Sequence, residues 1–175
     1  LQQVDVVFNG FHGEYGEDGK VQRFLDTFGI PYTGSGALAS AIAMNKLTAK
    51  EHLREHGIIM AEHIVLTVSD TLEEDVRKLA KSIPGKVVVK PLAAGSSVGV
   101  TIGQTFDELM PAIYKAFEYS PQVLVEEHIS GKEATCGVTE HFRGEALYAM
   151  LPIEIRPPQG AFFDYSVKYG DDTEN

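Results

Sequence analysis

A lysine followed by small residues is the clearest chemical signal in this sequence. Lys90 ends the β-branched run 86–90, and the segment 92–100 after it contains two glycines and the serines Ser96 and Ser97. Small side chains let a ligand approach the backbone, and loop amides, hydroxyls and an ammonium group can together hold phosphate oxygens. The segment is not a P-loop, because no Gly-Lys-Ser/Thr follows. A tight β-hairpin with an exposed lysine explains the same pattern, so the spacing leaves both interpretations open.

Carboxylates supply a second signal further along the chain. The apolar run 123–125 leads into Glu126 and Glu127, and Glu133 follows within the same segment. Carboxylates at a strand end can accept hydrogen bonds from an amino group and from ribose hydroxyls. A solvated strand end with ordinary surface acids is the simpler explanation of this segment taken in isolation.

An acidic, glycine-rich turn, 12–19, precedes an expected helix. Backbone amides at a helix N-terminus lie at the positive end of its dipole, so the turn is expected to favour a substrate carboxyl group. His12 by itself could equally be a turn residue that bonds to its own loop.

Alternating strand and helix patterns indicate an α/β fold that positions these groups. Strands are expected at 5–8, 64–67, 86–90 and 123–125, with a further pair at 134–139 and 146–151 joined by a turn near Arg143-Gly144. Helices are expected at 21–28, at 37–56, and after two capping boxes, Thr71 with Glu74 and Thr105 with Glu108. Pro111, inside the last helix, is expected to cost a hydrogen bond or to shift the start of that helix.

Composition excludes several classes of protein. The 175 residues are 43% hydrophobic and carry a formal net charge of −10, which makes nucleic acid an unexpected partner because its backbone would be repelled. No apolar run is long enough to cross a bilayer, so no membrane association is expected. The single cysteine, Cys136, suits a reducing compartment, and a small buried strand residue explains it better than a catalytic nucleophile.

The lysine strand, the Gly-Ser-Ser-Val-Gly loop and the Val-Leu-Val-Glu-Glu strand together resemble the ATP-grasp fold. Other stretches resemble the D-alanine–D-alanine ligase family in the family's order, and the resemblance runs from Asp5 to Tyr169. These stretches are 11–19, 29–36, 43–46 and 163–169. The resemblance implies α/β architecture with α+β ATP-grasp lobes. It divides the chain into the remainder of an N-terminal α/β substrate domain (1–36), a central lobe (37–121), and the start of a C-terminal lobe (122–175) with a mobile active-site loop (156–175).

The resemblance also assigns an ATP site. It implies that Lys46 and Lys90 hold the phosphates, with Ser96 and Ser97 in the small-residue loop that closes over them. It further implies that Glu126 accepts from the adenine side, that the backbone of Glu127 and Ile129 frames the ring, and that Glu133 binds the ribose.

Substrate and catalytic roles follow from the same resemblance. His12 matches a residue near the first D-alanine. Glu17, Ser96 and Tyr169 match a hydrogen-bonded set at the active site, and Lys168 and Tyr169 lie in the mobile loop. Relatives that make D-alanyl-D-lactate lack this Lys-Tyr pair, so Lys168 and Tyr169 favour a dipeptide product.

The implied function is ATP-dependent ligation of two D-alanine molecules through an acyl phosphate, for peptidoglycan precursor and cell-wall synthesis in the bacterial cytoplasm. The family is commonly dimeric, so a homodimer is expected. Two alternatives stay open. One is a different ATP-grasp carboxylate–amine ligase, including a D-alanine–D-lactate ligase, and the other is an inactive ATP-binding fragment.

The sequence departs from the family pattern in several places. Family segments are expected before Asp5 and after Tyr169, and the later one supplies the ligands of Mg²⁺ (or Mn²⁺), so no metal ligand is expected in this chain. Because that metal neutralises the phosphates of ATP, these residues alone are expected to turn over poorly or not at all. Within the chain, Asn9-Gly10-Phe11 replaces a more apolar, proline-containing run, and Asn45 replaces the usual aspartate before Lys46.

Overall fold

The computed structural model describes residues 4–95 and 97–156. The chain divides into two compact units, Leu1–His128 and Ile129–Asn175. No helix in the described ranges is long and apolar enough to span a membrane. The combination of helices and antiparallel strands confirms a mixed α and β fold, with the strands that carry Lys90 and Glu126 in the first unit.

The first unit begins with a short extended segment and two helices, α1 (Lys20–Thr27) and α2 (Ala37–Met44). The strand expected at 5–8 is reduced to one parallel bridge between Val7 and Tyr32. The Val7 amide donates to Pro31 O at 2.8 Å, and Val7 O accepts from the Thr33 amide at 3.0 Å. A strand needs a continuous ladder of such pairs, and within the described residues the segment has only this contact.

The prediction of a single helix at 37–56 is wrong, because the helix is interrupted at Asn45. Asn45 has extended backbone (φ −86°, ψ 109°), and its Oδ1 accepts from the amides of Leu47 and Thr48, both at 3.1 Å. This is an N-cap, the role in which asparagine stabilises the start of a helix. A new helix, α3 (Lys46–Glu55), therefore begins at Lys46.

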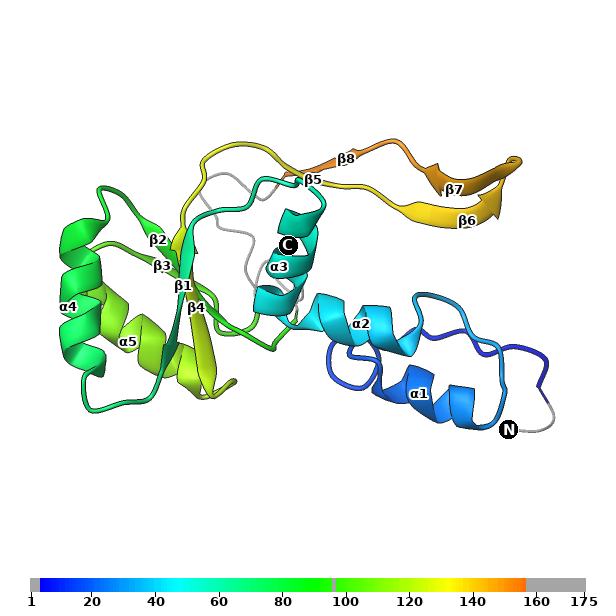
Figure 1. Cartoon of the computed structure of the whole chain (residues 1–175), viewed down its shortest axis with the longest axis horizontal. Coiled ribbons are helices and arrows are strands. Elements are labelled where there is room, and N and C mark those ends of the chain that lie inside the picture. Colours follow the sequence, from blue (N-terminus) through cyan, green and yellow to red (C-terminus); the bar gives the residue numbers. More distant parts are fainter. Residues whose placement is uncertain (1–3, 96, 157–175) are drawn as a thin grey trace, which may run out of the picture. The chain divides into compact units, whose positions relative to one another are not determined.

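A four-stranded antiparallel sheet forms the centre of the first unit. Its strands are β1 (His63–Thr67), β2 (Val87–Pro91), β3 (Thr101–Gly103) and β4 (Gln122–Glu127), in the order β1-β4-β2-β3. Helices α4 (Leu72–Ser82) and α5 (Phe106–Phe117) cover one face of it (Figure 1). Because β4 pairs with both β1 and β2, residues 122–127 belong to this unit, and the three-part domain division stays a prediction.

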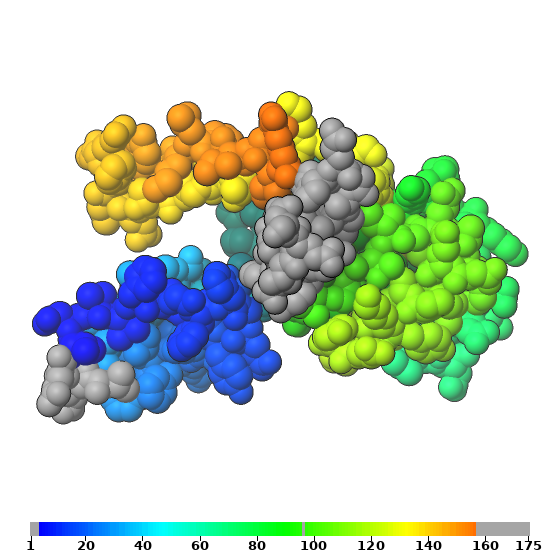
Figure 2. All heavy atoms as spheres, turned by 180° about the vertical axis from the view of Figure 1, so that it is seen from behind, coloured from blue at the N-terminus to red at the C-terminus, as the bar shows by residue number. Residues whose placement is uncertain are grey.

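Strand alternation separates the core from the functional face. Side chains that pack with α4 and α5 come from alternate positions of β2 and β4, namely Val87, Val89, Val123 and Val125. In the space-filling view, the green and yellow-green atoms of this part of the chain form one packed mass (Figure 2). The intervening positions, among them Lys90 and Glu126, point to the opposite face.

The two expected capping boxes have different outcomes. At α5 the box is confirmed, since the Thr105 and Glu108 side chains each bond to the other residue's backbone. At α4 it is wrong, because the Thr71 hydroxyl donates to the Asp75 carboxylate at 3.0 Å instead of capping the helix.

Pro111 lies on the exposed side of α5, and the helix runs through it from Phe106 to Phe117. A proline at this position has no N–H to donate to the carbonyl four residues earlier, and on the solvent side water can satisfy that carbonyl.

The described part of the second unit contains four short strands. They are β5 (Glu133–Thr135), β6 (Val138–Phe142), β7 (Glu145–Ala149) and β8 (Ile153–Ile155), with β6 paired to β7 and β5 paired to β8. The predicted turn is confirmed, since Arg143 and Gly144 both have positive φ between β6 and β7. The two long strands predicted here are each interrupted, and the Met150 amide donates to Gly137 O at 2.8 Å where they break.

Cys136 lies in the interruption before β6. It is exposed, so the prediction of a buried strand residue is wrong. Its thiol donates to Met150 O at 3.1 Å. The residues of the strands on either side, β5 and β6, are mostly exposed as well.

At Gly19, the residue before α1, the backbone lies very close to Ala37 of α2, and this contact can be tested by substitution. Its φ is 88°, and a Cβ there would lie 2.3 Å from Ala37 O. Gly29 also has positive φ (62°), but nothing lies within 4 Å of its Cβ position. We expect Gly29→Ala to destabilise the protein by about 1–2 kcal/mol through the left-handed backbone alone, and Gly19→Ala by about a further 1–3 kcal/mol through the clash. Urea unfolding of both variants measures the difference, and equal losses would contradict the close approach of α2.

Candidate functional site

Three lysines gather around one buried carboxylate on the face of the sheet opposite α4 and α5. Lys90 on β2 forms a close ion pair with Glu126 Oε1, and Lys50 on α3 lies 2.9 Å from Glu126 Oε2. Lys46, one turn before Lys50, is close enough to Lys90 and Glu126 to feel both charges. Three cations around one anion leave this site with excess positive charge, which suits an anionic ligand.

The register of the sheet explains why Lys90 and Glu126 meet. Val88 pairs with Glu126 and Lys90 pairs with Leu124, so Lys90 and Glu126 are diagonal neighbours on one face. Such diagonal positions lie within reach of long side chains. Lys46 and Lys50 share one side of α3, because residues four apart on a helix are neighbours.

The Lys46 ammonium is held by the end of β2 and the loop that follows it. Its Nζ donates to Pro91 O at 2.9 Å and to Ala94 O at 2.6 Å, and its backbone amide donates to Leu92 O at 3.1 Å. The pKa of Lys46 is lowered to about 8, first by burial and then by the Lys90 charge, while Glu126 opposes both effects. A bound anion would compensate the positive charge of the buried Lys46 ammonium and so stabilise its protonated form.

Glu126 keeps its charge despite being mostly buried, with an 8% exposed side chain. Burial by itself would raise the pKa of Glu126, but the close contacts with Lys90 and then Lys50 outweigh it and hold that pKa below its ordinary value. The carboxylate is therefore ionised and accepts hydrogen bonds only.

The loop 92–100 is built from consecutive turns. The Val98 amide donates to Gly95 O at 3.1 Å, the Val100 amide donates to Ser97 O at 3.2 Å, and Ser97 has positive φ. Strands β2 and β3 do pair in an antiparallel manner, so the segment is a hairpin, but a long loop joins the strands and Lys90 is largely buried in its ion pair. Ser96 lies outside the described residues.

Glu17 is brought next to this loop. It lines a cavity of about 270 Å³ together with Lys46, Ala94 and Gly95. A Cβ placed on Gly95 would lie 3.9 Å from Glu17 Oε2, and the Glu17 carboxylate accepts a hydrogen bond from the Gly13 amide. Two predicted site residues distant in sequence, Glu17 and Lys46, therefore share one cavity.

His12 is exposed and lines a neighbouring cavity of about 640 Å³, which Glu17 also lines. At the N-terminus of α1, where an anion site was expected, two of the first amides already have partners within the chain. The Lys20 amide donates to Asp18 Oδ1 at 3.0 Å and the Val21 amide donates to Tyr15 O at 3.1 Å. Asp18 itself thus supplies the negative charge that a helix N-terminus favours.

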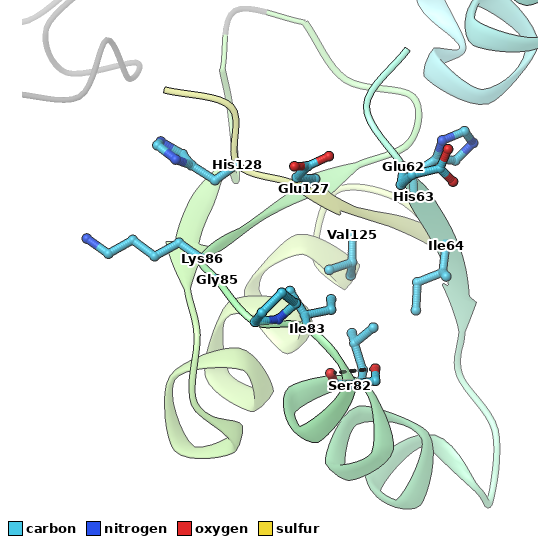
Figure 3. A pocket seen from close by; sticks show the side chains of 12 residues that line it. Glu62, His63, Ile64, Ser82, Ile83, Gly85, Lys86, Val125, Glu127 and His128 are labelled. Atoms are coloured by element: carbon cyan, nitrogen blue, oxygen red, sulfur yellow. Dashed lines mark hydrogen bonds between the residues drawn. The ribbon is translucent and has the colours of Figure 1, made fainter. Parts of the chain in front are cut away.

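Glu127 points away from the lysine cluster. Its amide donates to Glu62 O at 2.9 Å, and its side chain lines a third cavity, of about 470 Å³, beside β1 and the end of α4 (Figure 3). The neighbouring strand positions 126 and 127 face opposite sides of the sheet.

The remaining predicted residues belong to other parts of the sequence. Ile129 and Glu133 belong to the second unit, where Ile129 is 67% exposed and Glu133 is an exposed residue at the start of β5. Lys168 and Tyr169 lie outside the described residues. Within the ranges 4–95 and 97–156, no group of three or more His, Cys, Asp or Glu side chains is placed to hold a metal ion.

Sequence reasoning missed three side chains that shape the site. Lys50 was detectable from its four-residue spacing after Lys46, which places both on one helix face. Asn9 and Gln22 gave no comparable signal. Their side-chain amides both donate to Gly16 O, at 2.9 Å and 2.7 Å, and so fix the turn that carries Glu17.

Family models match nearly the whole chain. The model described as D-ala D-ala ligase N-terminus matches residues 1–35, and the model described as D-ala D-ala ligase C-terminus matches residues 52–175. The D-alanine–D-alanine ligase of Geobacter sulfurreducens is 43% identical over 95% of this chain and 49% of its own length.

Solved structures agree with these matches. The crystal structure of D-alanyl-alanine synthetase A from Vibrio cholerae has a TM-score of 0.83 and 34% identity, covering 98% of this chain and 51% of that chain. The VanG D-Ala:D-Ser ligase from Enterococcus faecalis has a TM-score of 0.79 and 35% identity, covering 95% of this chain and 47% of that chain. The chain thus spans about half the length of the relatives it matches. With both family models matched in order and the ATP-grasp arrangement of strands in place, the chain belongs to the D-alanine–D-alanine ligase family.

Proposed function

We propose that this chain supplies the nucleotide-binding part of an ATP-dependent D-alanine–D-alanine ligase. The observation that carries the proposal is the lysine cluster. Lys46, Lys50 and Lys90 surround one ionised carboxylate, and burial makes the charge of Lys46 unfavourable until an anion binds. The triphosphate of ATP would supply such an anion, and the adenine amine of ATP would donate a hydrogen bond to Glu126.

The proposed reaction uses ATP to phosphorylate the carboxylate of one D-alanine. The amine of a second D-alanine then attacks the acyl phosphate, which gives the dipeptide, ADP and phosphate. Lys46 and Lys90 would stabilise charge on the transferring phosphoryl group, and Glu17 lines a cavity shared with Lys46 where a substrate could be oriented.

Further roles belong to the same proposal. The backbones of Glu127 and Ile129 would frame the adenine, Glu133 would bind the ribose, and His12 would lie near the first D-alanine. Ser96 and Ser97 would close over the phosphates, and Lys168 and Tyr169 would cover the site. Mg²⁺ or Mn²⁺ would accompany ATP and neutralise part of its charge.

The wider setting is also proposed. A ligase of this kind would act as a homodimer in the bacterial cytoplasm and supply the dipeptide for peptidoglycan synthesis. The family membership supports this setting, because the curated relatives are D-alanine–D-alanine ligases.

The choice of second substrate needs a direct test. The chain is about as similar to a D-Ala:D-Ser ligase as to the Vibrio synthetase, at 35% and 34% identity. We would incubate the intact protein with ATP, Mg²⁺ and D-alanine, alone or with D-serine or D-lactate, and identify the products by mass spectrometry. D-alanyl-D-alanine as the main product is expected. D-alanyl-D-serine or D-alanyl-D-lactate as the main product would replace the substrate assignment, and ATP binding without any ligation would favour a nucleotide-binding module.

The lowered pKa of Lys46 predicts how ATP binding depends on pH. With a pKa of about 8, it loses its proton as the pH rises from 7 to 9 in the nucleotide-free protein, while neighbouring Glu126 stays ionised because its pKa is lowered. Phosphate binds the protonated lysine, so ATP affinity is expected to fall by about tenfold over this range. Calorimetry at several pH values measures the fall. Lys46→Arg is the control, since arginine stays protonated and should flatten the profile. Identical profiles in the two proteins would show that another group controls the affinity.

A further inference from the structure

The Glu126 carboxylate is shared by two lysines that come from different elements. Lys90, on the adjacent strand β2, contacts Oε1, and Lys50, on helix α3, lies 2.9 Å from Oε2. All three side chains are largely removed from solvent, with exposed fractions of 8% for Glu126, 15% for Lys50 and 27% for Lys90. Two cations therefore compensate one buried anion, and the anion needs only one of them.

In the proposed function, Lys90 binds a phosphate of ATP rather than Glu126. A lysine that holds a phosphate oxygen of ATP has to direct its ammonium toward that oxygen, which weakens or breaks its contact with Glu126. A buried carboxylate left without any partner is strongly unfavourable and would take up a proton or draw the lysine back. Binding at Lys90 is therefore compatible with a charged Glu126 only if a second cation remains on the carboxylate.

Lys50 meets that requirement. It contacts the other carboxylate oxygen, so it does not compete with Lys90 for the same position. It stands one helical turn after Lys46, and α3 is anchored beside the loop by the bonds of Lys46 to Pro91 O and Ala94 O. The Lys50 ammonium thus reaches Glu126 from α3, the helix whose first residue, Lys46, is proposed to bind the phosphates.

We propose that Lys50 is a positioning residue of the nucleotide site, which holds the Glu126 carboxylate for the adenine amine while Lys90 moves from Glu126 to the phosphates. This inference rests on the proposed function, since it assigns the phosphates to Lys90 and the adenine amine to Glu126. Its consequence is specificity: Lys50 would contribute to the preference for adenine without touching ATP.

The test compares the binding of ATP and inosine triphosphate, which carries an oxygen in place of the adenine amine. Calorimetry on the intact protein gives both dissociation constants for wild type, Lys50→Met, Lys50→Arg and Arg54→Met. Methionine keeps the apolar stem of lysine but removes its charge. Arg54→Met removes an exposed charge from the same helix and serves as the matched control.

Lys50→Met is expected to weaken ATP binding by at least about tenfold and to lower the ATP-to-inosine-triphosphate preference by about tenfold, the loss of a charge-assisted hydrogen bond. Lys50→Arg should restore most of the preference, and Arg54→Met should leave it unchanged. If methionine disturbs the packing, seen as a lowered urea midpoint, Lys50→Gln repeats the measurement with a polar end.

An unchanged preference in folded Lys50→Met or Lys50→Gln would overturn the proposal, even if both nucleotides bind more weakly, because a merely structural role lowers both affinities alike. A wild-type protein that binds neither nucleotide would remove the proposed function and this inference together. A wild-type protein that binds ATP, with variants that keep its preference, would remove this inference alone.

Discussion

Lys46→Met is expected to lower kcat/KM for ATP by about 10²–10³-fold, the usual effect of removing one group that stabilises charge in a transition state. Lys46 combines a partly buried ammonium, hydrogen bonds to Pro91 O and Ala94 O, and a cavity shared with Glu17. Methionine retains the packing of the side chain but loses both the charge and the two hydrogen bonds. The loss should appear in kcat as well as in KM, since in the proposed reaction the charge on the transferring phosphoryl group grows. Steady-state kinetics with varied ATP measure both parameters.

Lys78→Met is the matched control for this experiment. Lys78 is a highly exposed lysine on α4, the helix on the other side of the sheet, and it is expected to keep wild-type kinetics. A Lys46→Met protein with kcat within about twofold of wild type would contradict the phosphate role of Lys46, because that change corresponds to far less than one lost charge contact.

Ile113→Ala is expected to reduce the free energy of unfolding by about 2–5 kcal/mol. Ile113 lies on α5, is 0% exposed, and packs in the core between the two helices and the sheet. Truncation removes apolar contacts and leaves a cavity that the surrounding side chains fill only partly. Urea unfolding followed by circular dichroism measures the loss.

The same substitution at Ile59 provides the control. Ile59 is 96% exposed, so Ile59→Ala removes the same atoms from a site already in water and should change the free energy of unfolding by less than about 0.5 kcal/mol. If both variants lost the same stability, Ile113 would not belong to the cooperative core of the protein.

The lysine strand and the acidic strand were predictable because they are local patterns. The runs 86–90 and 123–125 are β-branched or apolar, and they became β2 and β4 with small shifts at their ends. The confirmed capping box before α5 and the turn at Arg143-Gly144 are equally local. In each case neighbouring residues carry both the signal and the structure that it predicts.

The incorrect predictions have several causes. The expected helix 37–56 breaks because the Asn45 side chain competes for the amides of the next turn, which outweighs the helix preference of its neighbours. The expected strand at 5–8 depends on a partner that the sequence does not specify. Two amides at the start of α1 are taken by Asp18 Oδ1 and Tyr15 O, which the sequence pattern does not indicate.

By itself, the sequence determined the identity of the charged groups and the strands that carry Lys90 and Glu126, since alternation fixes which side chains share a face. Only the tertiary structure decided what surrounds them. It added Lys50 to the carboxylate and brought Glu17 into the cavity of Lys46. These contacts join α3, β2, β4 and the turn before α1, which are far apart in the chain. Burial, charge compensation and the pKa of Lys46 arise from such contacts, so they exist only once the chain is folded.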